Sequence, residues 1–231
     1  IIMTLKTFTD PDYSRLLPNT YSTGIDGLDV DYLQGIPYGS VVGIIADPRV
    51  QYELFNYHLV HTDRPTEYVS TVRPGRLITQ DIESMGTIVD GIHIEDVFGS
   101  RETAKNIILK HVGRIEEGHN YILDTVGSYY LLEENPDMFL QTLRNVYTTV
   151  HDKNAIAYLN FTNIAPAASS EYIQEAIGMC DGIFNLTQEV KSRDIETFLE
   201  IKRMRKRSYP SERIKVETNN ILTIDTTQNI A

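Results

Sequence analysis

Three short apolar runs, at residues 41–45, 121–123 and 155–159, constrain the fold of this chain more than any other feature. An unbroken apolar run of this length is typical of a strand that is covered on both faces. Helical patterns lie between the runs, and alternating strands and helices indicate βαβ units around a parallel sheet. We therefore predict an α/β fold with a mainly parallel central sheet.

Two of the helical patterns carry start signals. Asn135 and Pro136 predict the start of a helix whose apolar residues recur on one face. Ser100 predicts the cap of another helix, which we expect to end near Gly118. The apolar stripe of that second helix includes His111, because the spacing follows the 3.6-residue period.

The pattern changes after Leu186. Three β-like stretches follow, at about 194–204, 212–217 and 220–225, and turn-forming residues separate them. Strands that follow one another through short turns pair antiparallel. We expect them to form a C-terminal antiparallel hairpin extension of the sheet.

Composition limits the domain organisation and the class of protein. With 231 residues, 41% hydrophobic content and no apolar run near the length of a membrane span, we expect one soluble core. We predict an N-terminal arm at 1–20 and a single domain at 21–231. The lone Cys180 excludes an internal disulfide, and the N-terminus lacks a secretory signal, so we expect a cytoplasmic protein. A net charge of −11 disfavours broad binding to nucleic acid.

Short motifs occur in a fixed order along the chain. They are Ser22-Thr23-Gly24-Ile25-Asp26-Gly27-Leu28-Asp29, Gly35-Ile36-Pro37-Tyr38-Gly39-Ser40, Tyr121-Ile122-Leu123-Asp124-Thr125, Cys180-Asp181-Gly182-Ile183-Phe184-Asn185-Leu186 and Ile201-Lys202-Arg203-Met204-Arg205. From about residue 20 to about residue 225 this order resembles the KaiC-like ATPases of the RecA superfamily. The resemblance implies a RecA-like three-layer sandwich, with Asp124 and Thr125 at the end of the Walker B strand.

The same resemblance places a phosphate-binding loop of the form G-x-x-x-x-G-K-[ST] just after the first apolar run. Such a loop works because its glycines admit backbone N–H groups to the phosphates, its lysine reaches their oxygens and its hydroxyl holds magnesium. Here the glycine positions hold Ala46 and Gln51, the lysine position Tyr52 and the hydroxyl position Glu53. The whole segment reads Ala46-Asp47-Pro48-Arg49-Val50-Gln51-Tyr52-Glu53. We predict a degenerate loop that does not support ordinary ATP turnover.

The catalytic carboxylate is also missing at its expected position. The resemblance puts Val72 where active relatives have the glutamate that polarises the attacking water, and Glu67 falls at the other end of that strand. Asp124 remains, either to cap the next turn or to keep a metal role. We therefore predict no catalytic residue, no metal site and no cofactor. Weak binding of ATP and magnesium, through Arg49 or at Asp124, is the alternative.

A basic segment lies in the predicted hairpin, with five basic residues in the six positions 202–207. In KaiC-like oligomers the matching Lys-x-Arg pair reaches phosphates bound by the adjacent subunit, which implies this role for Arg203 and Arg205. Strand alternation would send Lys202, Met204 and Lys206 to one face, and Arg203, Arg205 and Arg207 to the other. The segment is then a solvated edge that resists aggregation, a subunit interface or a contact for nucleic-acid phosphates.

The sequence favours a KaiC-like pseudo-ATPase that acts as an accessory or regulatory protein, so an enzymatic activity is not expected. Its expected partners are further copies of the chain, as a homo-oligomer, or an intact KaiC-like homologue. Two alternatives stay open. One is a nucleic-acid-associated recombinase-type paralogue that uses the basic hairpin, and the other is a weak nucleotide-binding ATPase that retains Asp124.

Overall fold

The structure is a computed structural model that describes residues 16–25, 27–60, 64–87, 89–98, 100, 102–162, 170–191, 194–219 and 221–224. Its strands are β1 (Thr20–Tyr21), β2 (Ile36–Pro37), β3 (Ser40–Ala46), β4 (Thr66–Ser70), β5 (Ile92–Asp96), β6 (Asn120–Asp124), β7 (Ile156–Asn160), β8 (Gly182–Lys191), β9 (Asp194–Met204), β10 (Arg213–Asn219) and β11 (Ile221–Ile224). Its helices are a π-helical segment η2 (Leu28–Leu33), α1 (Tyr52–Leu59), α2 (Gly75–Ser84), α3 (Ala104–Val112), α4 (Val126–Leu132), α5 (Pro136–Asp152) and α6 (Glu171–Met179).

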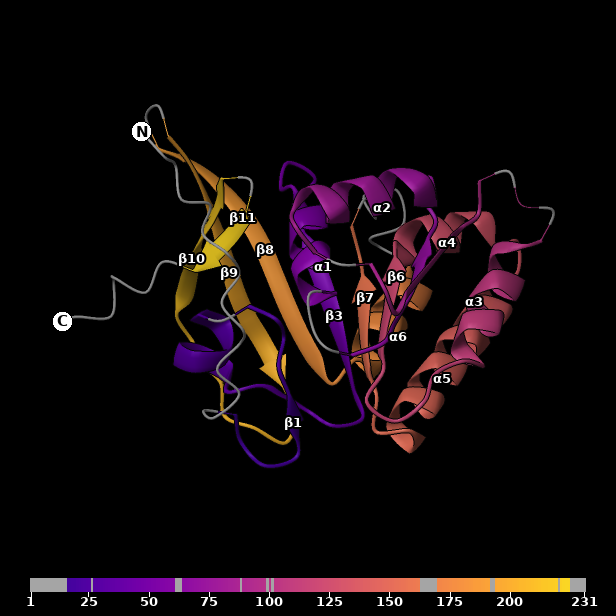
Figure 1. Ribbon diagram of the computed structural model, residues 1–231. Coiled ribbons are helices and arrows are strands. Elements are labelled where there is room, and N and C mark those ends of the chain that lie inside the picture. Colours follow the sequence, from indigo (N-terminus) through magenta and orange to yellow (C-terminus); the bar gives the residue numbers. More distant parts are fainter. Residues whose placement is uncertain are drawn as a thin grey trace.

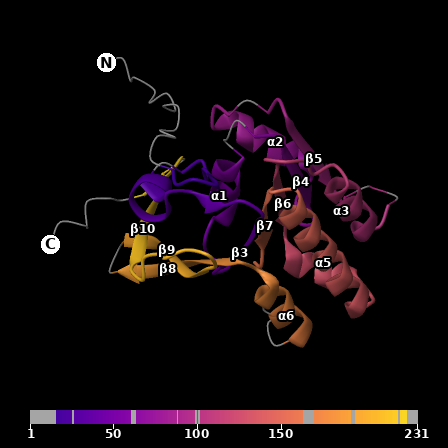
Figure 2. The ribbon, with the colours of Figure 1, turned by 90° about the horizontal axis from the view of Figure 1, so that it is seen from below.

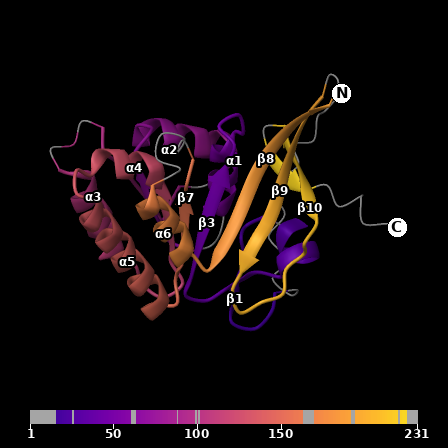
Figure 3. The same cartoon turned by 180° about the vertical axis from the view of Figure 1, so that it is seen from behind.

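In the described part of the chain, nine strands form one sheet in the order β11-β10-β9-β8-β3-β7-β6-β4-β5 (Figure 1). The strands from β8 to β5 in this order run parallel, and β3 lies between β7 and β8. Strands β9, β10 and β11 then continue the sheet antiparallel, and Figure 3 shows β8, β9 and β10 side by side. The predicted parallel sheet and its C-terminal antiparallel extension are both confirmed.

Helices cover both faces of the parallel part of the sheet (Figure 2). One apolar cluster joins the sheet to α1 and α2 through residues such as Phe55 and Ile82. A second cluster joins the opposite face to α3, α4, α5 and α6 through residues such as Ile107, Leu143 and Ile173. The three-layer arrangement that the resemblance implied is confirmed. The unbroken apolar runs agree with it, because strands between two helical layers need apolar side chains on both faces.

The predicted helix boundaries are right for α5 and wrong for α3. Asn135 caps α5, since its side chain accepts hydrogen bonds from the first backbone N–H groups of the helix. Helix α3 is capped by Thr103, which accepts from the Asn106 N–H, and not by Ser100. It also ends at Val112, well before Gly118. The cause is local, because a second hydroxyl closer to the apolar stripe takes the capping position.

Strand β5 was not predicted. Its central residues His93 and Glu95 interrupt the apolar pattern, and none of its side chains is fully buried. It lies at the edge of the sheet, where it pairs with β4 alone among the described strands. An edge strand needs fewer apolar residues than a central one, so the periodicity signal is weak.

The predicted arm at 1–20 lies largely outside the described residues. Of its last part, the Leu17 N–H donates to the Gln34 carbonyl, and β1 pairs antiparallel with β2. Among the described helices, none combines the length and apolar character needed to cross a membrane.

Candidate functional site

The segment after β3 forms a turn that is closed by its own side chains. Asp47 accepts hydrogen bonds from the Arg49 backbone N–H and guanidinium, with the shortest contact at 2.7 Å. These bonds lower the pKa of Asp47 to about 2. Val50, at the end of the turn, is buried and its N–H donates to the Asp47 carbonyl. The arginine that could attract an anion is thus paired with a carboxylate of the same turn.

Tyr52, at the position of the missing lysine, points into the protein. It is the first residue of α1 and only 6% exposed. Its hydroxyl lies close to Asp124, at the end of β6, and to Thr162, which follows β7. Burial, followed by the charge of Asp124, raises the pKa of the Tyr52 hydroxyl far above its usual value. The tyrosine is therefore a neutral hydrogen-bonding group.

Asp124 is enclosed by a network of polar side chains from four elements. It is 1% exposed, and its Oδ2 accepts a 2.8 Å hydrogen bond from the Tyr68 hydroxyl. Tyr68 in turn accepts from Asn56, and Asn56 accepts from Asn160. Burial raises the pKa of Asp124 to about 6, although the hydrogen bond from Tyr68 lowers it. Asp124, which the resemblance puts at the end of the Walker B strand, is thus a buried carboxylate.

One of the two roles expected for Asp124 was to cap the next turn, but Thr125 caps it instead. Thr125 accepts a hydrogen bond from the Ser128 N–H at the start of α4. The backbone of Thr125 is also held by Thr71, whose hydroxyl bonds to both its N–H and its carbonyl at 2.8 Å. Asp124 is thus free of any capping task, and its carboxylate faces the two tyrosines.

The strand that should end in a catalytic carboxylate does not carry one near Asp124. Val72 follows β4 and is half-buried. In the β4–β6 pair, Ser70 lies opposite Asp124 and Glu67 lies opposite Tyr121. Ser70 and Glu67 are three residues apart on the strand, which corresponds to about 10 Å. Glu67 therefore cannot replace the missing glutamate at the candidate site.

A second set of polar contacts is centred on Arg73. Arg73 donates to the Tyr57 hydroxyl at 2.6 Å and to Asp81 at 2.7 Å. Glu53, at the former hydroxyl position, is near enough to raise the pKa values of Tyr52 and Asp124 by its charge. The cation beside the candidate site is consequently committed to α1 and α2.

These residues do not fit ATP with magnesium. The lysine and hydroxyl positions of the resemblance hold Tyr52 and Glu53, and Tyr52 is only 6% exposed. Over the described ranges, no group of three His, Cys, Asp or Glu side chains could hold a metal ion. Among the described residues, this geometry provides no set of ligands for the weak binding of ATP and magnesium predicted at Arg49 or Asp124.

Comparison with known proteins places the chain in a family. A family model described as a family of unknown function (DUF7125) matches residues 20–231. The chain belongs to DUF7125. The crystal structure of a KaiC-like protein from the hyperthermophilic archaeon Pyrococcus horikoshii OT3 is similar to it, with a TM-score of 0.72 and 18% identity over 89% of this chain and 98% of that one. No curated protein matches. The likeness confirms the predicted RecA-like, KaiC-like fold.

In this DUF7125 protein the basic hairpin is tied to the end of α6. Arg203 donates to the carbonyls of Ile177 and Cys180, at 2.8 and 2.7 Å. Arg205 reaches Asp181 at 3.4 Å and the Gly178 carbonyl at 3.3 Å, and remains 46% exposed. Both arginines thus donate to carbonyls at the C-terminal end of α6. Their predicted contact with a neighbour's phosphate stays a prediction.

The other cations of the hairpin differ in their surroundings. Arg207 donates to the Gly35 carbonyl at 2.9 Å, and Lys202 pairs with Glu200 on the same strand. Lys206 is exposed, and its left-handed backbone marks the end of the strand. Exposed charge is therefore concentrated at Lys202, Arg205 and Lys206.

The predicted alternation of side chains in this strand is wrong. Gly182 lies opposite Met204 but Phe184 lies opposite Ile201, so β9 has one residue more than β8 over this stretch. Because of this bulge, Met204 turns to the buried face with Ile201 and leaves Lys202 exposed. A regular alternation cannot hold across an extra residue.

The residues that surround Asp124 in DUF7125 were not all predicted. Tyr68 was read only as part of a strand, and Asn56 and Asn160 were not singled out. A weak signal existed, since polar residues at the ends of neighbouring parallel strands meet at one edge of the sheet. The side-chain directions that bring them together depend on the packing of α1 on the sheet.

Proposed function

We propose that this protein is a KaiC-like pseudo-ATPase, a non-catalytic accessory or regulatory protein that acts by assembling with copies of itself or with an intact KaiC-like homologue. The observation that carries the proposal is the position of Tyr52. Where the resemblance expects a lysine that extends to phosphate oxygens, the chain has a tyrosine that is only 6% exposed and lies close enough to Asp124 for that charge to raise the pKa of its hydroxyl. The side chains of Tyr52 and Tyr68 therefore occupy the interior of the site.

The charges of the loop support the proposal. Loss of one charged hydrogen-bond donor to a phosphate costs roughly 1.5–3 kcal/mol, or about 10- to 100-fold in affinity. Asp47 and Glu53 add negative charge at the place where a triphosphate would lie, and Arg49 is paired with Asp47. Both the missing attraction and the added repulsion act against ATP.

An assembly role is supported by the fold and by the exposed charge of the hairpin. The chain is similar to a KaiC-like protein over most of its length. Lys202 and Arg205 have side chains that are 50% and 46% exposed at the end of β9. These two cations are available to acidic groups of a neighbouring subunit, while Arg203 holds the strand against α6.

Nucleotide binding is tested by titrating the full chain with ATP and magnesium. We expect no thermal shift and no phosphate release above the blank, while a catalytically intact KaiC-like protein gives both under the same conditions. A tight magnesium-dependent complex would reverse the proposal. Phosphate release that Asp124→Asn abolishes would instead favour the weak-ATPase alternative, since that substitution keeps the size of the side chain.

Assembly is tested by sedimentation of the full chain, alone and with an intact KaiC-like homologue. We expect a species larger than the monomer, which Lys202→Ala with Arg205→Ala weakens and Lys105→Ala leaves unchanged. Lys105 is a matched control because it is a half-buried lysine of α3, on another element. A monomer at high concentration that retains no homologue would remove the assembly proposal without affecting the nucleotide result.

A further inference from the structure

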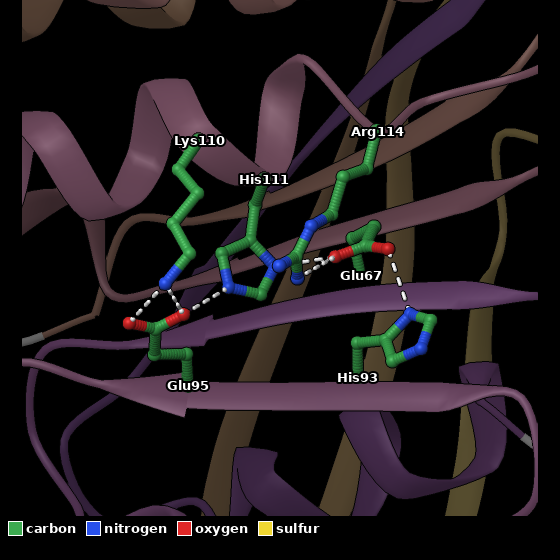
Figure 4. A network of polar contacts seen from close by, with 6 residues as sticks. All are labelled: Glu67, His93, Glu95, Lys110, His111 and Arg114. Carbon is green, nitrogen blue, oxygen red and sulfur yellow. Dashed lines mark hydrogen bonds and ion pairs between the residues drawn. The ribbon is translucent and has the colours of Figure 1, made fainter.

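A cluster of charged side chains, remote from the candidate site, joins β4, β5 and α3 at the edge of the sheet. Figure 4 shows how its members face one another across the two strands and the helix. They are Glu67, His93, Glu95, Lys110, His111 and Arg114. Neither the nucleotide proposal nor the assembly proposal makes use of them.

His111 lies between two carboxylates and is only 1% exposed. Its Nδ1 is 2.5 Å from Glu67 Oε2, an ion-pair contact whose direction is not that of an aligned hydrogen bond. Its Nε2 is 3.0 Å from Glu95 Oε2 and is hydrogen bonded to it. Each nitrogen of one buried ring therefore faces a carboxylate oxygen.

Glu67 is 2% exposed and has further partners. Its Oε1 is 2.8 Å from His93 Nδ1, and Arg114 Nη1 is 3.7 Å from its Oε2. From β6, Tyr121 lies opposite Glu67, and the charge of Glu67 adds to the burial that raises the pKa of Tyr121. On its other side α3 shares a buried apolar cluster with α5. Groups from β5 and α3 thus contact both oxygens of Glu67.

Glu95 is held in its ionised form as well. Lys110 contacts both of its oxygens, at 2.9 and 2.8 Å. Burial alone would raise the pKa of Glu95, but the hydrogen bonds from Lys110 and His111 outweigh it and lower that pKa. His111 thus lies between the carboxylates of Glu67 and Glu95.

We propose that His111 is a buried imidazolium that clamps α3 to β4 and β5, and that loss of its proton loosens this edge of the sheet. An ionised carboxylate only accepts hydrogen bonds, and a neutral imidazole has one donor and one acceptor nitrogen. A neutral ring would set a lone pair against one of the two carboxylates. Only the doubly protonated ring satisfies both contacts.

The place of the clamp determines what its release affects. Strand β5 pairs with β4 alone among the described strands, so the Glu95 contact with His111 is a second tie that holds β5 to the body. After deprotonation of His111, Glu67 would still contact His93 and Arg114, and Glu95 would still contact Lys110. We expect β5 and α3 to open locally as the pH rises, while the centre of the sheet stays closed.

The protonation state is tested by nitrogen NMR of the full chain labelled at histidine, with the His111 signals assigned from His111→Gln. At neutral pH we expect both ring nitrogens of His111 to carry protons. A single neutral tautomer under these conditions would overturn the proposal. This readout is independent of whether any variant is destabilised.

Loosening of the edge is tested by hydrogen exchange at several pH values, with protection factors corrected for the intrinsic pH dependence of exchange. In the wild-type chain, the opening of β5 and α3 amides should increase with pH by at most about tenfold per unit, because one proton is released. His111→Gln should remove this dependence, and Glu67→Gln should weaken it in case the first variant does not fold. His93→Gln and His151→Gln should retain it, since these rings are 62% and 54% exposed. An equal pH dependence in His111→Gln and the wild type would contradict the clamp.

Discussion

Tyr68 donates a 2.8 Å hydrogen bond to Asp124, and the exposed fractions of the two side chains are 0% and 1%. Asn56 donates to the same Tyr68 hydroxyl, so the Asp124 carboxylate ends a chain of neutral polar side chains. The ionised form of a buried carboxylate with neutral partners is less stable than it would be in water. For this reason the pKa of Asp124 is raised to about 6. The energetic consequences of this arrangement can be measured directly.

Asp124→Asn should stabilise the protein at high pH and not at low pH. The folded state binds the Asp124 proton more tightly than the unfolded state. The stability that this proton contributes is therefore complete below the usual aspartate pKa of 3.8 and is lost as the pH rises through about 6. The shift corresponds to up to about 3 kcal/mol. Denaturant titrations at pH 4 and pH 8 should therefore show a substitution effect that is more favourable at pH 8.

Two controls help to interpret the Asp124→Asn titrations. Asp29, whose pKa burial also raises to about 6, titrates in both proteins and cancels in their difference. Asp90→Asn, at an exposed position, should show no such pH dependence. An Asp124→Asn effect that is the same at both pH values would mean that the carboxylate is not buried in its charged form.

Tyr68→Phe should destabilise the protein more at pH 8 than at pH 4. At pH 8 the lost bond ends on an ionised carboxylate, which makes it worth roughly 1.5–3 kcal/mol, whereas at pH 4 the carboxyl is protonated. Tyr158→Phe is a matched control, because the buried Tyr158 hydroxyl has no hydrogen-bond partner within the described residues. Unfolding by urea measures both variants, and an equal cost for the two would exclude a role of the Tyr68 bond.

Arg203→Ala should lower the free energy of unfolding by about 1–3 kcal/mol, because the carbonyls of Ile177 and Cys180 lose a charged donor. Lys206→Ala should change it by no more than about 0.5 kcal/mol, as is usual for an exposed position. Thermal unfolding compares the two. If Arg203→Ala is as stable as the wild type, the arginine is not needed for the fold and is available for an intermolecular contact.

Two glycine substitutions should act in opposite directions. In Gly43→Ala the new methyl group would lie 3.0 Å from Ile183 and 3.1 Å from Cys180, so overpacking should cost about 1–3 kcal/mol. In Gly178→Ala, within α6, nothing lies within 4 Å, and the higher helix propensity should stabilise by about 0.5–1 kcal/mol. Calorimetric melting temperatures of the two variants should lie on either side of the wild-type value.

The helix α5 and the central strands could be predicted because their signals are local. Asn135 and Pro136 start α5 as expected, and each unbroken apolar run became a strand between two helical layers. Strand β5 and the start of α3 were missed. At β5 the alternation of Ile92, His93 and Ile94 belongs to an edge strand, and its pairing is a contact across the chain.

The candidate site was only partly predictable. The residue types at Tyr52 and Glu53 were enough to predict a degenerate phosphate-binding loop, which stays a prediction. That Tyr52 turns inward to Asp124, and that Tyr68 and Asn56 complete the network, depends on how α1 packs over the sheet. Similarly, His111 has helical apolar spacing, and the sequence contains nothing that brings Glu67 and Glu95 to its two nitrogens.

By itself, therefore, the sequence determined the order and type of most elements and the residue types of the loop after β3, because both depend on residue identity at local spacing. Only the tertiary structure decided where the buried charges lie. The pairs Tyr52 with Asp124 and His111 with Glu67 join residues that are far apart in the chain. Their energies depend on distance and burial, which exist only once the strands and helices are packed.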